Sequence, residues 1–269
     1  MLAKHRWLVP GVAVFLVVGL PGIAEAGINV PNGSLVSASS PKSYSYSTSA
    51  DYWSVFAIQP TSTSDFDMTL LDSTNKLLGS SDYGTGVTDF VAVDSNAGTR
   101  PLGTYTANVT QYLAGGSFWA QAQYGTNIIT LPPITHQGTT GFSDPDIAYA
   151  NLNSNNIVSI ADIYLTAGQS FWAVSPDDAT SLYLLEANPS QSTTFVQGRS
   201  IAGANQHTQV IDNCTLYTAQ LTGWHALVLI GDRAPVNTSP QQGIGIGLHR
   251  YDPTQPNYCP IADFPGPTP

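Results

Sequence analysis

Residues 64–76 read SDFDMTLLDSTNK, and this stretch decides how the chain around it folds. Apolar and polar side chains alternate from Phe66 to Leu70, which is the two-residue period of a strand with one buried face. Residues 72–75 are turn formers, because their short polar side chains hydrogen-bond to nearby backbone. The stretch therefore predicts a half-buried β-strand that ends in a turn at Asp72.

The same two-residue period recurs along the chain in short segments separated by Gly, Asn, Ser and Asp, which is typical of a β-sandwich. Charged residues make up only 10% of the sequence, and after Ala26 the sole glutamate is Glu186. Because surface helices depend on Glu and Lys, this composition favours strands over helices. We therefore expect an all-β fold, with strands in residues 43–47, 52–58, 64–71, 87–93, 103–110, 117–124, 157–165, 170–174, 181–186, 221–230 and 243–248.

Two of these segments carry a resemblance to a known family. DFDMTLLDSTNKLL (65–78) and GTYTANV (103–109) resemble paired strands of the bacterial pre-peptidase C-terminal (PPC) domain, and residues 81–94 resemble the part between them. The resemblance covers residues 43–124. It implies a small extracellular β-sandwich, antiparallel and jelly-roll-like, that accompanies secreted enzymes and surface proteins in an accessory role such as export, folding or attachment to a substrate.

The second half of the chain repeats this plan with less fidelity. Residues 181–186 (SLYLLE) are the counterpart of the opening stretch 64–76 when the two Leu-Leu pairs are aligned, although the aspartates are missing. Residues 221–230 (LTGWHALVLI) resemble the GTY strand. The sequence therefore predicts two tandem β-sandwich modules, the second degenerate, each with its own core.

Export is predicted from the first residues. The basic residues 4–6 precede the apolar segment 12–20, and residues 24–26 (AEA) have the small-x-small pattern of a signal-peptidase site. The apolar segment is shorter than the roughly 20 residues of a membrane span. We expect a secreted, extracellular protein that is cleaved after Ala26 and has no membrane attachment afterwards.

The expected organisation has five parts. They are a signal peptide (1–26), a first PPC-like sandwich (27–125), a linker rich in Pro and Gly (126–150), a second PPC-like sandwich (151–252) and a proline-rich C-terminal tail (253–269).

The sequence has two cysteines, Cys214 and Cys259. An even number of cysteines in a protein expected outside the cell favours a disulfide between them. Such a bond would tie the proline-rich tail to the second sandwich, since the tail has little apolar periodicity. Two buried free thiols are the alternative, because two cysteines alone do not establish a framework.

Asp65, Asp67 and Asp72 form the acidic group that we interpret as a candidate calcium site, and calcium is the only cofactor that the sequence suggests. Asp65 and Asp67 are two residues apart, so their side chains should leave the strand on the same side. Carboxylates from a strand end and a loop suit calcium. The alternative is that they cap turn backbone on the solvent face, because calcium takes about six to eight oxygens and no glutamate is near.

No catalytic residues are assigned, because neither a Gly-x-Ser-x-Gly elbow nor a His-Glu-x-x-His motif occurs. His225 follows Trp224 on a predicted strand and is expected to face solvent. A Ser-His-Asp triad is the alternative, because its members can lie far apart in the sequence and would then match no local motif. The histidines after residue 26 lack the spacing of a metal-binding pair; they are His136, His207, His225 and His249.

No ligand-binding residues are assigned either. Several aromatic residues would stack on sugar rings if they shared one exposed face, but filling the sandwich cores is favoured because exposed aromatic patches are uncommon. They are Tyr44, Tyr46, Tyr52, Trp53, Trp119, Trp172 and Trp224.

Charge and motifs together predict a secreted, non-catalytic accessory or binding protein that adheres to an extracellular glycan or fibrous protein. The formal net charge of −10 repels phosphate backbones, so nucleic acid is excluded as a partner. A structural subunit of an extracellular matrix or filament, formed by self-association through edge strands, is the alternative. A secreted hydrolase ranks below both, because no convergent group of titratable residues stands out.

Overall fold

The computed structural model describes residues 34–37, 42–48, 53–94, 103–113, 115–124, 128–129, 147–151, 156–174, 180–186, 193–196, 199–203, 207–211, 214–232, 243–250 and 253. Every regular element in these ranges is a β-strand, which confirms the all-β prediction. The same residues contain no helix long and apolar enough to cross a membrane.

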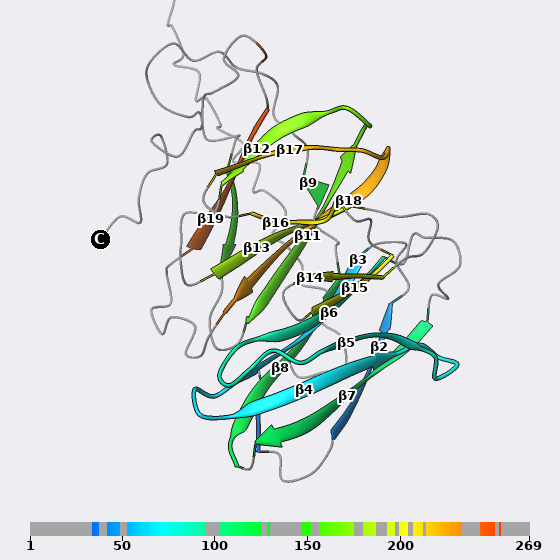
Figure 1. Cartoon of the computed structure of the whole chain (residues 1–269), viewed down its shortest axis with the longest axis vertical. Coiled ribbons are helices and arrows are strands. Elements are labelled where there is room, and N and C mark those ends of the chain that lie inside the picture. The colour runs from blue at the N-terminus through cyan, green and yellow to red at the C-terminus, as the bar shows by residue number, and fades with distance from the viewer. Residues whose placement is uncertain are drawn as a thin grey trace, which may run out of the picture.

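The first half of the chain forms strands β1 to β8, which largely follow the predicted segments. They run in the order β1-β8-β3-β6 and β5-β4-β7-β2, and both runs belong to one 10-stranded sheet that curls around a common core (Figure 1). Their bounds are β1 (Ser34–Ser37), β2 (Lys42–Thr48), β3 (Trp53–Pro60), β4 (Asp65–Leu71), β5 (Leu77–Ser81), β6 (Asp89–Asp94), β7 (Gly103–Leu113) and β8 (Ser117–Tyr124).

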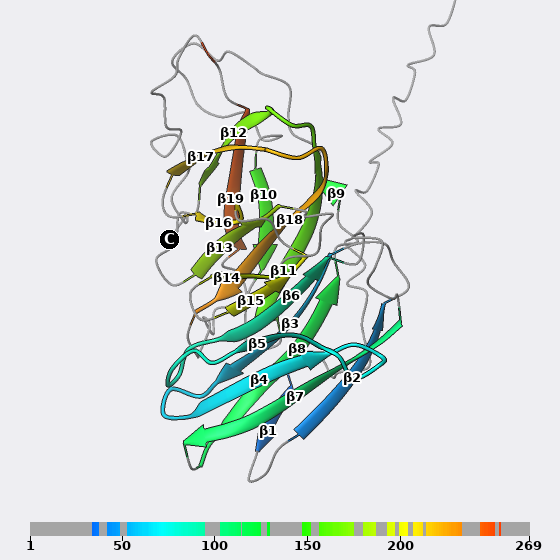
Figure 2. The ribbon, with the colours of Figure 1, turned by 45° about the vertical axis from the view of Figure 1, so that its right-hand side comes forward.

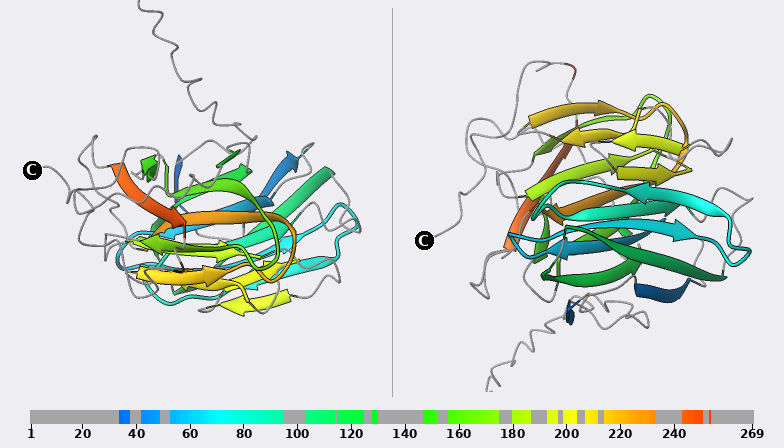
Figure 3. Two further views of the ribbon diagram at one scale, coloured as in Figure 1. Left: turned by 90° about the horizontal axis from the view of Figure 1, so that it is seen from above. Right: turned by 60° about the horizontal axis from the view of Figure 1, so that its bottom comes forward.

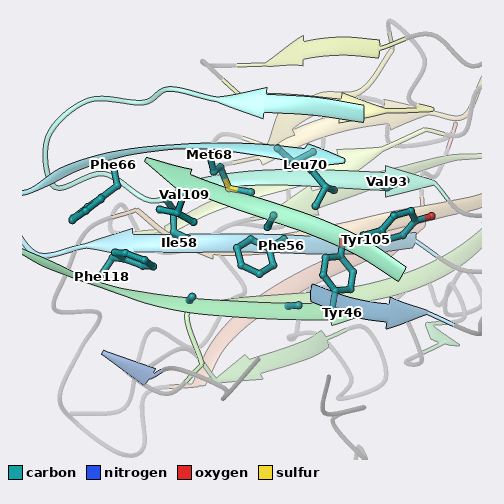
Figure 4. Packing of buried hydrophobic residues seen from close by; sticks show 14 of the residues in the cluster. Tyr46, Phe56, Ile58, Phe66, Met68, Leu70, Val93, Tyr105, Val109 and Phe118 are labelled. Carbon is teal, nitrogen blue, oxygen red and sulfur yellow. The ribbon is translucent and has the colours of Figure 1, made fainter. Parts of the chain in front are cut away.

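The alternation on which the fold prediction rests is confirmed in β4. Phe66, Met68 and Leu70 are buried, whereas Asp67 and Thr69 lie on the other, partly exposed face. Figure 4 shows the buried side chains packed with those of β3, β7 and β8. This first core also contains Tyr46, Phe56, Ile58, Val91, Val93, Tyr105, Ala107, Val109, Phe118, Ala120, Ala122 and Ala202.

The second half forms two further sheets, with orders β10-β19-β12-β17 and β16-β13-β18-β11-β9. A second core made of β11, β12, β13, β17 and β18 side chains lies between them. The bounds are β9 (Ile128–Ile129), β10 (Ile147–Asn151), β11 (Val158–Leu165), β12 (Ser170–Val174), β13 (Thr180–Leu185), β16 (Gln209–Ile211), β17 (Cys214–Thr218), β18 (Gly223–Gly231) and β19 (Gly243–Arg250).

The strand order of the first half recurs in the second. The run β1-β8-β3-β6 corresponds to β10-β19-β12-β17, and β5-β4-β7-β2 corresponds to β16-β13-β18-β11, with counterparts in the same order along the chain. The registers agree as well: Leu71 pairs with Thr106, and Leu185 pairs with Ala226. Gly103 and Gly223 begin β7 and β18 with φ angles of 147° and 156°, a conformation that favours glycine.

One hairpin breaks this correspondence, because it comes from the second half and joins the sheet of the first. It consists of β14 (Thr193–Val196) and β15 (Arg199–Ala202). β15 lies between β5 and β6, parallel to β6 and antiparallel to β5 (Figure 2). Gly79 on β5 permits this approach, since a Cβ there would lie 2.7 Å from the Ser200 Cβ.

A third core joins the two halves. Figure 3 shows the strands of the two halves lying side by side. The outer faces of β3 and β6 pack against β11, β13 and β18, so every residue of β3 and of β6 is buried. The prediction of a separate core for each sandwich therefore missed the core between them. Its members are Trp53, Val55, Ala57, Phe90, Ala92, Ile157, Val158, Ile160, Tyr183, Leu185, Ile201, Ala226, Val228 and Ile230.

Several predicted features lie outside the described residues. They are the signal peptide with its cleavage after Ala26, most of the linker 126–150, Cys259, and the tail apart from residue 253. Cleavage and the Cys214–Cys259 disulfide therefore stay predictions.

Candidate functional site

The structure does not bring Asp65, Asp67 and Asp72 together as a calcium site. They lie along or just beyond one extended strand, and at about 3.3 Å per residue Asp65 and Asp72 are roughly 20 Å apart. Among the described residues, no group of three or more His, Cys, Asp or Glu side chains is arranged to hold a metal ion. The prediction that these carboxylates converge was wrong, because the strand stays extended through Leu71.

Asp72 instead caps its own turn. Its Oδ1 accepts hydrogen bonds from the Thr74 N–H (2.8 Å), the Thr74 hydroxyl (2.7 Å) and the Lys76 N–H (2.9 Å). The Thr74 hydroxyl contributes most to holding the pKa of Asp72 below its usual value. This is the alternative that the sequence left open, and it allows Asn75 its positive φ of 64°.

Asp65 and Asp67 remain close enough to influence each other. Burial raises the pKa of Asp67, and the charges of Asp65 and Asp82 raise it further. Asp65 is 6% exposed and accepts a hydrogen bond from the Thr85 hydroxyl at 3.3 Å. The register of β4 against β7 shifts between Asp65 and Phe66, which turns Asp65 out of the simple alternation.

The exposed feature that stands out is an aromatic pair on β11 and β18. Tyr164 and Trp224 are directly opposite in the ladder, and their rings meet edge to face with centroids 5.3 Å apart. Tyr164 is 52% exposed, and Trp224 is partly exposed. Among the described exposed apolar residues, Tyr164 is the one whose ring contacts another aromatic ring.

The corresponding position in the first half shows that the fold does not require aromatic residues there. Trp224 follows Gly223 as Thr104 follows Gly103, and Thr104 pairs with Ser47 on β2. Ser47 and Thr104 place two hydroxyls 3.1 Å apart on an exposed face. The same sheet position thus holds two small hydroxyl residues in one half and the aromatic pair in the other.

Two short loops beside the aromatic pair are held to each other. Residues 166–169 join β11 to β12, and residues 219–222 join β17 to β18. The Gly168 N–H donates to the Ala219 carbonyl at 2.7 Å, and the Ala167 N–H donates to the Thr222 hydroxyl at 3.0 Å. Neither loop contains a charged residue, so the aromatic pair has an uncharged rim with exposed Thr166, Gln220 and Thr222.

The aromatic residues singled out in the sequence mostly fill cores, as favoured. Tyr46 and Trp53 are fully buried, Tyr44 packs against the first core, and Trp119 packs against the core between the halves. Trp172 is partly buried, and Tyr52 lies outside the described residues. Tyr164 was not singled out, although it stands where the alternation of β11 changes from buried to exposed.

Two carboxyl groups are buried where the two halves meet. Asp162 on β11 and Asp94 on β6 are 0% and 1% exposed, and the Trp53 indole N–H donates to the Trp224 carbonyl at 3.2 Å. Neither Asp162 oxygen has a well-formed hydrogen bond to the described residues. Burial raises the pKa of Asp162 to about 8; the Asp94 charge adds to this rise, and the Trp53 amide opposes it. Burial thus favours the protonated form of Asp162.

A second buried carboxylate, Glu186, binds the backbone of the 219–222 loop. Glu186, which directly follows β13, is fully buried, and its Oε1 accepts the N–H groups of Gln220 (2.5 Å) and Leu221 (2.7 Å). His225 is also fully buried; its Nε2 lies 3.4 Å from the same oxygen, and its Nδ1 lies 2.9 Å from the Gly223 carbonyl. The prediction that His225 faces solvent was wrong, because both faces of β18 are covered by sheets from here onward.

Arg199 on β15 anchors the inserted hairpin. Its guanidinium donates to the Thr88 carbonyl, with Nε at 3.0 Å, and to the Tyr183 hydroxyl, and it lies 4.6 Å from the centre of the Tyr83 ring. Tyr183 belongs to the second half and Thr88 to the first, so Arg199 connects them. Burial raises the pKa of nearby Asp89 to about 7, although hydrogen bonds from Ser81 and Tyr83 and the Arg199 charge oppose this.

Comparisons with known proteins add no family. No protein-family model matches the chain, and no curated protein matches it. Among solved structures, an uncharacterized protein from Burkholderia cenocepacia is 8% identical with a TM-score of 0.23, over 78% of this chain and 76% of that one. A variant of Bacillus subtilis oxalate decarboxylase is 9% identical with a TM-score of 0.17, over 79% of this chain and 69% of that one. TM-scores this low give no basis for a shared fold or function.

Proposed function

We propose that the chain is a secreted, non-catalytic binding protein that adheres to a neutral extracellular glycan through the Tyr164–Trp224 pair. The observation that carries this proposal is that the fold accepts Ser47 and Thr104 at the equivalent position, so nothing in the architecture calls for two large aromatics. Tyr and Trp are enriched where proteins bind, because they offer a large, rigid apolar surface with a polar edge.

The surroundings of the aromatic pair suit a sugar better than an ion. A sugar ring has an apolar C–H face, which stacks on aromatic rings, and hydroxyls around its edge, which need neutral donors and acceptors. The uncharged rim residues 166–169 and 219–222 supply hydroxyl and amide groups. The net charge of −10 disfavours an anionic polysaccharide at long range, so a neutral glycan is the expected class.

The architecture is consistent with this role. The recurring strand order supports two tandem sandwiches, each with the strand order of a jelly roll, a fold that includes lectin domains. The resemblance of residues 43–124 to the PPC domain supports the same role, because PPC domains are accessory modules outside the cell. Both arguments rest on fold-level analogy and support the proposal only as context.

A binding assay with matched variants tests the proposal. The purified protein is incubated with insoluble cellulose, chitin and collagen, and the bound fraction is measured. The double variant Tyr164→Ser, Trp224→Thr installs the residue types that the first half uses at this position, so it should fold. We expect it to lose at least about tenfold in affinity for a polysaccharide, as truncation of an aromatic hot spot does.

The control is Tyr112→Ser, because Tyr112 is 71% exposed on β7 and its ring contacts no other aromatic ring among the described residues. It should bind like the unmodified protein. Equal losses in the two variants, or no retention on any polysaccharide, would refute the proposal. Retention on collagen alone, lost in the double variant, would replace the glycan with a fibrous protein.

A structural subunit remains the second candidate, favoured by the edge strand β2. β2 pairs only with β7 among the described strands, and its sequence KSYSYST carries one charge, at Lys42. Unpaired edges with little charge are open to pairing with another chain. Filaments or sheets in electron micrographs that appear with rising protein concentration, together with no glycan retention, would favour this candidate.

A further inference from the structure

The outer face of β12 and β17 carries an apolar pair. Phe171 on β12 and Tyr217 on β17 are buried in the second core, so their neighbours Trp172 and Leu216 lie on the opposite face of the sheet. Trp172 and Leu216 are directly opposite in the ladder, and neither belongs to any of the three cores. Leu216 is 37% exposed, and Trp172 is partly exposed. Figure 1 shows β12 and β17 at the end of the molecule that lies away from the first half.

In the first half, the equivalent face is buried. β3 and β6 correspond to β12 and β17 in the recurring strand order, and their outer faces pack against the second half. Val55 on β3 and Phe90 on β6 are fully buried there. One sandwich therefore has a cover over this face, whereas none of the cores formed by the described residues includes the Trp172–Leu216 pair of the other sandwich.

A second copy of the chain is poorly suited as this cover. If two copies stacked as the two halves do, the outer face of β4, β7 and β2 would lie on Trp172 and Leu216. That face is rich in hydroxyl groups, and burying them against apolar side chains without hydrogen-bond partners costs free energy. Its residues include Ser43, Ser45, Ser47, Asp67, Thr69 and Thr104.

The end of the chain leaves the sheet beside the apolar pair. His249 on β19 is the ladder partner of Trp172, and β19 ends at the next residue, Arg250. Pro253 lies exposed beyond the strand. Residues 254–261 (TQPNYCPI) follow and contain no charged side chain. Prolines lack the N–H that a ladder strand donates, but proline-rich segments dock on aromatic side chains, so this stretch suits the face of the sheet better than its edge.

The distances allow the tail to be tied across this face. β12 lies between β19 and β17, and the two ladders place Cys214 three residues along from Arg250. Two strand spacings and three residues of rise put their Cα atoms about 14 Å apart. The nine residues from Arg250 to Cys259 span up to about 28 Å as polyproline. Cys259 can therefore reach Cys214, and the direct path crosses β12 beside Trp172.

We propose that residues 254–261 dock on the Trp172–Leu216 pair and cover the outer face of the second sandwich, with a Cys214–Cys259 disulfide as their anchor. Cys214 is two residues before Leu216 on β17, so its position belongs to the same face. Weak stacking on Trp172 is sufficient, because a tether gives the segment a high effective concentration. Docking of the tail is independent of the aromatic pair and of glycan binding.

Hydroxyl-radical footprinting read by mass spectrometry tests the docking, because oxidation of a side chain follows its access to solvent. The complete chain is compared with a variant that ends at Pro253. We expect the oxidation of Trp172 to rise several-fold in the shortened chain, and that of Leu216 to rise with it. Tyr112 and Tyr164 lie on other strands and should be oxidised equally in both chains. Equal oxidation of Trp172 in the two chains would overturn the docking.

A second variant guards against loss of folding in the shortened chain, which oxidation of the buried Phe171 would reveal. Cys259→Ser keeps the tail but removes its anchor, and it should raise the oxidation of Trp172 while Phe171 stays protected. Peptide mapping without reduction should find Cys214 linked to Cys259. Free thiols, with Trp172 still protected by the tail, would overturn the anchor alone. Protection of Trp172 that persists in the shortened chain and grows with protein concentration would overturn the tail in favour of a second copy.

Discussion

The carboxylate that follows the Leu-Leu pair has different partners in the two halves of the molecule. Asp72 bonds to Thr74 and Lys76, three contacts within one turn. Glu186, one methylene longer, reaches the next loop and His225. The shorter side chain can satisfy only nearby donors, so the identity of a single residue decides whether the site is local or connects two strands.

The Asp72 turn gives a stability prediction. Asp72→Ala removes three hydrogen bonds to a charged acceptor and should lower the free energy of unfolding by about 1–3 kcal/mol. Asp67→Asn is the contrasting variant, because it removes a carboxylate whose pKa is raised by burial and by neighbouring charges, and it should leave stability unchanged or higher. Urea denaturation measures both, and equal losses would contradict this account of the turn.

Asp162 gives a pH prediction. Its pKa is about 8 in the folded protein against 3.8 as a free side chain, so the folded state binds more protons between these values. The Asp162 contribution to stability should therefore be fully present below about pH 4 and should be lost as the pH rises from about 4 to about 8, by up to roughly 1 kcal/mol for each pH unit.

The Asp162→Asn variant should lack this contribution, so its stability relative to that of the unmodified protein should increase as the pH rises. Denaturation midpoints at several pH values would show it. Asp82→Asn, which changes an exposed carboxylate, serves as the control and should follow the unmodified protein. A constant difference between Asp162→Asn and the unmodified protein at all pH values would disprove the titration.

Single residues were the level at which sequence reading was weakest. The alternation on β4 could be predicted because one of its faces is partly exposed. The burial of His225 could not be predicted from alternation, because β18 is covered on both faces. A signal was nevertheless present, since Gly223-Trp224-His225 matches Gly103-Thr104-Tyr105, and an inward Tyr105 would have predicted an inward His225.

Among the elements, the β14–β15 hairpin departs most from the plan. Local periodicity predicted the longer strands, but not β1, β5, β9, β10 or β14 to β17, most of which are short. Of these, β9 and β10 begin in the segment expected to be a linker. Pairing between β15 and β6 joins Ser200 to Val91, residues distant in sequence, and no local pattern encodes such a partner. The sequence offered Gly79 on β5 as a clue, but a glycine within a strand marks a close approach without naming what approaches.

A substitution at Gly79 tests how tightly the hairpin is held. Gly79→Ala would place its Cβ 2.7 Å from the Ser200 Cβ and 3.1 Å from Val91 Cγ1, so β15 has to shift. We expect a loss of about 1–3 kcal/mol in the free energy of unfolding, as overpacking produces. Gly84→Ala meets no atom within 4 Å and should be nearly neutral. If neither variant changed the free energy of unfolding, β15 would be only loosely packed against β5.

Taken whole, the molecule should unfold as one unit. The core between the halves, the Arg199 contacts and the inserted β15 all cross from one sandwich to the other. Differential scanning calorimetry should therefore show one transition whose calorimetric and van't Hoff enthalpies agree. Two separate transitions would show that the sandwiches are independent, as the sequence alone had suggested.

The inserted strand also dictates an order of events during synthesis. Strands β1 to β8 leave the ribosome well before β15, so the growing chain carries an open slot between β5 and β6. Contacts between residues far apart in sequence make folding slow, and unpaired strand edges attract other chains in the meantime. A translating or translocating chain of this kind would depend on holding factors until residue 202 has emerged, and arrest before that point would leave a product that cannot close its first sheet.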